Sequence, residues 1–168
     1  MSRMAIGSIA IVLLASLQCE PQETMVGLTR LRQTSIVVES LDADAKTLGF
    51  SIKSLESQML VGLRRDIPKL AVRESALPTL YVKVLALSEI YAAGQKSGFC
   101  VFVSLRMVRP VTILEDVGFG EVTFDLAKVW DEGSIVSGPP SSIRQQLKNS
   151  IDEKLTQFAA DHYRQNPQ

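Results

Sequence analysis

Two stretches of the chain carry apolar residues at every third or fourth position, which is the spacing of an amphipathic helix. The first follows Ser51, whose hydroxyl can accept from a first-turn amide, and ends at Pro68, whose ring blocks a further turn. The second begins near Ser142, which has the capping-box spacing to Gln145, and is expected to fray at residues 166–167. The two apolar stripes are Ile52, Leu55, Met59, Leu63 and Ile67, and Ile143, Leu147, Ile151, Leu155 and Phe158.

Alternation of apolar and polar residues predicts four strands, over residues 30–41, 80–91, 99–109 and 122–130. Pro110 is expected to weaken the third strand because proline cannot donate to the ladder. Residues 133–140, rich in Gly, Ser and Pro, are expected to form a loop, and glycines in residues 92–98 and 118–120 mark turns. One face of the middle strands is apolar, formed by Leu80, Val82, Val84 and Ala86, and by Phe99, Val101, Val103, Leu105 and Met107.

These elements give an α+β fold of two layers in the order β-α-β-β-β-α, with two amphipathic helices. The last three strands are expected to form an antiparallel meander, and the first helix is the crossover that lets the first strand join them. A length of 168 residues fits one domain, which we place at residues 28–168.

The second face of the middle strands carries Tyr81, Leu85, Leu87, Cys100 and Phe102, beside Lys83 and Arg106. The candidate interaction residues on it are Tyr81, Lys83, Leu85, Phe102 and Arg106. If both helices pack on the other face, this mixed surface is open to a partner. If the helices cover opposite faces, it is core. We expect the core arrangement, although the two cations suit a solvent face better.

Trp130 stands alone at the end of the fourth strand. Its ring suits two roles, sealing the edge of the core or stacking on a ligand. We therefore add Trp130 to the candidate interaction face.

The first 18 residues have the pattern of a signal peptide. Arg3 precedes residues 5–17, a run without charge that is too short to span a bilayer comfortably. Residues 19–27 follow as a polar tether. The sequence thus predicts an exported protein that is periplasmic, secreted or membrane-anchored.

Cys19 directly follows this hydrophobic run and is a candidate lipidation site. The preceding Ser16 and Gln18 depart from the Leu and the Gly or Ala of lipoprotein leaders, so an unmodified cysteine in the tether is the alternative. Cys100 lies in an apolar strand, where we expect a buried free thiol.

The 18 basic and 18 acidic side chains leave no net charge. Nucleic-acid binders show a basic excess or stripe, so we expect no nucleic-acid partner. The same charge balance argues against electrostatic attachment to an anionic membrane, so we expect membrane contact only through an amino-terminal anchor. The basic cluster Arg64, Arg65, Lys69 and Arg73 is explained mainly by the helix dipole, with a lipid headgroup or cell-wall polymer as the alternative.

Residues suited to catalysis are sparse, and we expect no catalytic site, no metal site and no cofactor. His162 is the single histidine, and we expect a partly covered side chain at a frayed helix end. The pairs Asp42 with Asp44 and Glu115 with Asp116 lack the spacing of a calcium loop and suit solvated turns.

Four features of the chain occur together: Ile36-Val37-Val38-Glu39, Gly62-Leu63-Arg64-Arg65-Asp66-Ile67, Trp130, and Phe158 followed by Tyr163-Arg164-Gln165-Asn166-Pro167. With these features the chain resembles a group of short exported bacterial proteins of unknown function. The resemblance implies no activity or ligand.

Three functions remain open. The first is a non-catalytic envelope protein, an accessory or binding module that binds another envelope protein through a sheet face or edge. The second is a small hydrolase or ligand-binding enzyme that works with carboxylates, which need no histidine. The third is a structural subunit of an envelope complex anchored through a lipidated Cys19.

Overall fold

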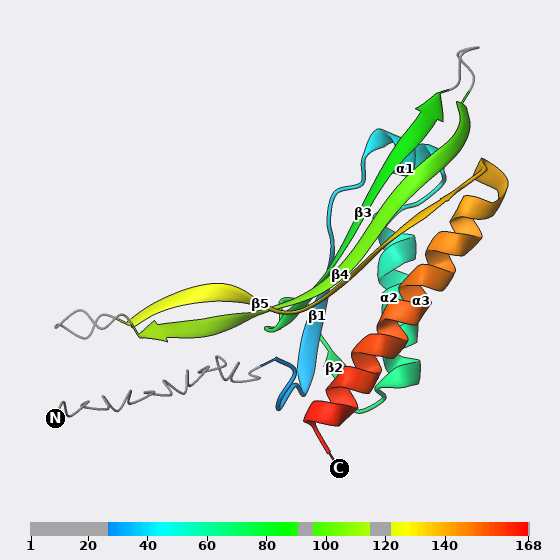
Figure 1. The fold of residues 1–168 in the computed structure, drawn as a ribbon. Coiled ribbons are helices and arrows are strands. Elements are labelled where there is room, and N and C mark those ends of the chain that lie inside the picture. The colour runs from blue at the N-terminus through cyan, green and yellow to red at the C-terminus, as the bar shows by residue number, and fades with distance from the viewer. Residues whose placement is uncertain (1–26, 91–95, 115–121, 168) are drawn as a thin grey trace, which may run out of the picture.

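The computed structural model describes residues 27–90, 96–114 and 122–167, which fold into one sheet covered by helices (Figure 1). The sheet has the order β2-β1-β3-β4-β5. Its strands are β1 (Gln33–Val38), β2 (Ala71–Val72), β3 (Thr79–Ile90), β4 (Lys96–Leu114) and β5 (Val122–Gly138). The helices are α1 (Ala43–Thr47), α2 (Ile52–Asp66) and α3 (Pro140–Gln165).

The predicted α+β class and strand order are confirmed. β3, β4 and β5 form an antiparallel meander, and β1 joins β3 in parallel after the crossover through α2. The two-residue strand β2 was not predicted; it pairs in parallel with the start of β1.

Both predicted helical stripes face the sheet. Leu55, Met59 and Leu63 of α2 are buried, and every stripe residue of α3 is fully buried. Ser51 caps α2 as predicted, since its side chain accepts from the Ser54 amide. Ile52 is 43% exposed, so its assignment to the stripe is wrong.

The meander strands are longer than predicted. β4 continues through Pro110, because β3 begins opposite Val108 and leaves β4 unpaired on one side from there. A proline is tolerated where its nitrogen faces such an open side. The predicted loop 133–140 is mostly strand, because residues 133–138 pair with residues 99–104 of β4.

Other boundaries also differ. The first strand is confined to Gln33–Val38, and β4 starts inside the turn predicted at residues 92–98. α3 begins at Pro140 after Pro139, without a side-chain cap, so the capping box is wrong. Proline suits this position because its ring already holds a helical φ. The turn at residues 118–120 and the pair Glu115 and Asp116 lie outside the described residues.

Asp42 and Asp44 cover a free edge of β3, and their assignment as solvated turn residues is wrong. Asp42 accepts from the Ala45 amide at 2.6 Å, capping α1, and from the Ala86 amide at 2.7 Å. Asp44 accepts from the Ser88 amide at 2.9 Å. The carboxylates thus replace the strand that β3 lacks beyond the end of β1.

Replacing Asp42 by alanine is expected to cost about 1–3 kcal/mol of unfolding free energy, because it removes a cap and leaves a strand amide unpaired. Asp42→Asn should cost less, since asparagine also caps helices. Chemical denaturation measures both, with exposed Glu153→Ala as the control. Equal stability of Asp42→Ala and the wild type would contradict this role.

His162 is buried, with 8% of its surface exposed, so the prediction of a frayed end is wrong. Its Nε2 lies 3.0 Å from the Leu31 carbonyl oxygen, and because a carbonyl only accepts, Nε2 carries the proton. The helix end is held further by Gln165, which accepts from the Leu28 amide, and by Asn166, which donates to the Leu28 carbonyl.

His162→Leu is therefore expected to destabilise the fold by about 1–3 kcal/mol, since it leaves the buried Leu31 carbonyl without its donor. Thermal unfolding followed by circular dichroism measures the loss. Glu153→Leu, a change at an exposed position of the same helix, is the control. A His162→Leu variant as stable as the wild type would show that this hydrogen bond makes no net contribution to the free energy of unfolding.

The basic cluster at the end of α2 is partly paired. Arg65 donates to both carboxylate oxygens of Asp66, and this guanidinium lowers the pKa of the Asp66 carboxyl. Arg73 lies elsewhere, beyond β2. Across the described segments, no helix is long and apolar enough to cross a membrane.

Candidate interaction face

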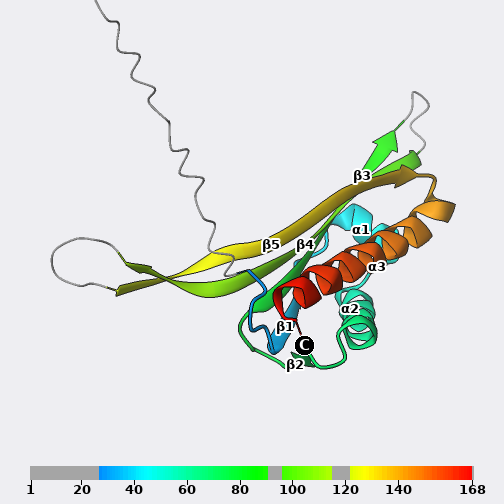
Figure 2. The same ribbon diagram turned by 60° about the horizontal axis from the view of Figure 1, so that its bottom comes forward.

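Both long helices pack on the same side of the sheet, and none of the helices in the described part of the chain covers the other side (Figure 2). The expectation that helices cover opposite faces is therefore wrong. We call the uncovered side the outer face. The strand register arranges it in four rows across β3, β4 and β5: Tyr81, Arg106 and Asp131; Lys83, Ser104 and Gly133; Leu85, Phe102 and Ile135; Leu87, Cys100 and Ser137.

The last two rows form an apolar half. Leu85, Leu87 and Ile135 are 41%, 70% and 68% exposed, although large aliphatic side chains are usually buried. The half-buried Phe102 ring lies over Gly133, where a Cβ would come within 3.3 Å of its Cε2 atom. The absence of a side chain at Gly133 thus leaves room for the aromatic ring of Phe102.

The first two rows form a charged half whose side chains are fixed by one another. Glu39, just beyond β1, accepts from Arg106 and lies 4.0 Å from the Lys83 ammonium nitrogen. The Arg106 guanidinium also lies 5.6 Å from the centre of the Tyr81 ring, a cation–π contact. Arg106 is thereby held between an acid and an aromatic ring.

A hollow of about 670 Å³ lies where the two halves meet. Phe102 and Ile135 line one part, and Lys83, Arg106 and Asp131 line the other. Asp131 accepts from the Lys128 ammonium group at 2.8 Å. Within the described residues, the buried Arg106 Nε has no hydrogen-bond partner. The hollow thus has an apolar wall on one side and charged side chains on the other.

Trp130 is not part of this face. The register shifts after Met107, and Trp130 lies opposite Met107, which faces the helices. Its Nε1 donates to Asp161 of α3 at 3.0 Å, and its ring packs edge-on against Phe158 with centroids 5.0 Å apart. Trp130 seals the edge of the core, and the structure separates it from the other five predicted residues.

Five of the six predicted face residues are brought together: Tyr81, Lys83, Leu85, Phe102 and Arg106. Ile135 was missed because it lies in the segment predicted as a loop. The adjacent β-branched pair Ile135-Val136 was the available signal of a strand. Cys100 is half-buried on this face rather than buried as expected.

A second hollow, beside α2, is relevant to the alternative function of an enzyme that works with carboxylates. Glu56 and Glu74 both line it, together with Lys53, Arg64 and Arg73. Both carboxylates are exposed, whereas a general acid needs surroundings that keep it protonated. Over residues 27–90, 96–114 and 122–167, no three His, Cys, Asp or Glu side chains are grouped to hold a metal ion.

Comparison with family models and with curated proteins gives no match. Among solved structures, the chain is similar to the PelC dodecamer from Paraburkholderia phytofirmans, at 15% identity over 77% of this chain and 89% of that chain, with a TM-score of 0.40. It is also similar to a minor lipoprotein from Acinetobacter baumannii, at 12% identity over 77% and 91%, with a TM-score of 0.29. A third is the rare lipoprotein B from Shewanella oneidensis, at 11% identity over 79% and 91%, with a TM-score of 0.23. Likenesses at this level assign neither a family nor an activity to the chain.

Proposed function

We propose that this chain is a non-catalytic protein of the bacterial cell envelope that binds another envelope protein through its outer face. The observation that carries the proposal is the apolar half, Leu85, Leu87, Phe102 and Ile135, lying uncovered beside a charged half. Contiguous apolar side chains rimmed by polar ones are typical of protein interaction sites.

A protein partner fits this surface better than a small ligand. The apolar row crosses three strands rather than lining an enclosed cavity. Arg106 is fixed by Glu39, so this side chain is held in place before a partner arrives. A surface ordered in advance loses little conformational entropy on binding.

The proposed location in the envelope rests on the signal-peptide pattern of residues 1–18. An anchor at the amino terminus would also leave the outer face accessible, because the described chain begins far from the apolar half. Arg109 of β4 donates to the Gly27 carbonyl, where the described chain begins. Phe102 lies seven residues before Arg109 in this strand, which places it roughly 23 Å away at about 3.3 Å per residue. A lipidated Cys19 would thus hold one end of the domain and leave the apolar half free.

Co-purification from native membranes tests the proposal with Ile135→Lys. Removing a buried isoleucine contact costs about 1.5–3 kcal/mol, or roughly ten- to a hundredfold in affinity, and a buried lysine adds to this. Val61→Lys is the matched control, because Val61 is equally exposed on α2. The same partner should be lost with Ile135→Lys and retained with Val61→Lys; retention by both would contradict the proposal.

A further inference from the structure

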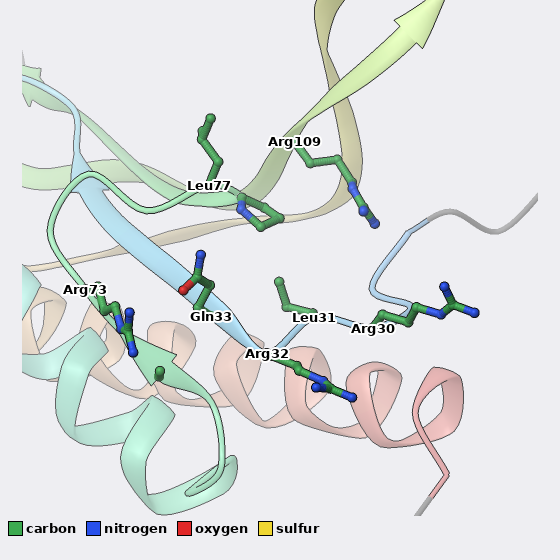
Figure 3. A pocket seen from close by; sticks show the side chains of 9 residues that line it. Arg30, Leu31, Arg32, Gln33, Arg73, Leu77 and Arg109 are labelled. Carbon is green, nitrogen blue, oxygen red and sulfur yellow. The ribbon is translucent and has the colours of Figure 1, made fainter.

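Four arginines line a third hollow, of about 460 Å³, at the end of the sheet where the described chain begins (Figure 3). Arg30 and Arg32 precede β1, Arg73 follows β2, and Arg109 comes from β4. Gln33 lies between them at the start of β1. The fold therefore collects at one place cations that are up to 79 positions apart in the sequence.

Among the residues that the structure describes, no aspartate or glutamate lines this hollow. The chain as a whole has equal numbers of acidic and basic residues, so composition does not explain this concentration of charge. Within the described part of the chain, the side chains of Arg30, Arg32 and Arg73 form no ion pair. Arg109 at the rim donates to the Gly27 carbonyl at 3.3 Å.

The backbone fixes the positions of these arginines. Arg30 has a φ of 58°, a left-handed conformation that is uncommon for residues other than glycine. Its amide donates to Asn166 at 2.6 Å, which holds it there. The Arg32 carbonyl accepts from the Ala71 amide, and the Arg73 amide donates to the Thr34 carbonyl, both at 3.0 Å. The loops carrying the charges are thus tied to β1, β2 and α3.

We infer that this arginine-lined hollow binds phosphate groups. Guanidinium groups match phosphate oxygens in geometry and form charge-assisted bonds with them. The four guanidinium groups lie apart from one another and do not converge on one point, which suits several phosphates more than one small anion (Figure 3). The described chain begins beside the hollow, so an amino-terminal membrane attachment would bring it to the headgroups of anionic phospholipids. The inference concerns a separate site from the outer face.

The test measures binding of the full chain to vesicles of phosphatidylcholine with and without one-third phosphatidylglycerol. Residues 1–26 are the same in every variant, so their contribution to vesicle binding cancels when the affinities of two variants are compared. The triple variant Arg30→Gln, Arg32→Gln, Arg73→Gln should lose about a hundredfold in affinity for the anionic vesicles, at roughly fivefold per arginine. The control Lys46→Gln, Lys53→Gln, Lys148→Gln removes the same charge from exposed helix positions and should lose far less.

A second arm titrates inorganic pyrophosphate and follows the unfolding temperature. A rise that the arginine variant lacks, together with unchanged vesicle binding, would keep a phosphate site but exclude lipid as its source. Equal behaviour of the two triple variants in both arms would overturn the inference. Circular dichroism checks that the arginine variant is folded, and single substitutions at Arg32 and Arg73 replace it if it is not.

Discussion

Replacing Phe158 by alanine is expected to lower the free energy of unfolding by about 3–5 kcal/mol, the largest effect of a single change that we foresee. Phe158 is completely buried, and its ring packs edge-on against Trp130 at an interplanar angle of 73°. The substitution leaves a cavity between α3 and β5, and it also removes the support that orients the tryptophan. The free energy of unfolding of a domain is usually about 5–15 kcal/mol, so the variant would retain only a small part of its stability.

Urea denaturation followed by circular dichroism measures this change. The fluorescence of Trp130, the single tryptophan, reports separately whether the ring has become exposed. Glu153→Ala, at an exposed position of the same helix, is the control and should change stability by less than about 0.5 kcal/mol. A loss below 1 kcal/mol for Phe158→Ala would mean that α3 does not pack on the sheet as described.

The second large effect concerns export. Changing Leu13 and Leu14 to arginine is expected to keep the protein in the cytoplasm as the unprocessed precursor. These leucines lie inside the hydrophobic run behind Arg3, where each arginine costs roughly 2.5–3.5 kcal/mol of insertion into the membrane. Fractionation of cells and the size of the product on a gel measure the outcome.

The matched control changes the same two leucines to isoleucine, which preserves the apolar run and should leave export unchanged. If the double-arginine variant were exported like the wild type, residues 1–18 would not be a signal. The proposal of an envelope function would then lose its basis, whereas the fold and the outer face would stand.

The apolar side of the sheet could be predicted from sequence, because burial on one face imposes a period of two. Leu80, Val82 and Val84 on β3 each face the helices, as does Met107 on β4. The stripe of α3 was equally clear, since its five residues are fully buried. A period identifies which side chains share a face, and here that was sufficient to find the core.

The uncovered state of the outer face could not be predicted in the same way. The alternation of side chains along these strands is the same whether the helices cover one face of the sheet or both. Only the side on which α3 packs distinguishes the two arrangements. That side depends on where β5 ends and how the chain turns at Pro139 into Pro140. The sequence around residues 133–138 is typical of a loop, but pairing with β4 overrides this local preference.

Long-range hydrogen bonds account for the remaining differences. His162 is buried because the Leu31 carbonyl, 131 positions away, lies next to it. Asp42 and Asp44 are drawn to β3 because the strand has unpaired amides at Ala86 and Ser88. The four-arginine hollow arises likewise from β1, β2 and β4 meeting at one end of the sheet. Contacts between residues so far apart in the sequence leave no pattern in any short segment of it.

Photo-crosslinking in living cells tests the outer face most directly. A photoreactive amino acid is placed at Leu87 or Ile135, the two most exposed apolar positions of the outer face, or at Val61 on α2 as the control. Our account predicts one and the same envelope protein crosslinked from both outer-face positions and not from Val61. Crosslinking of a partner from Val61 with none from Leu87 or Ile135 would contradict it.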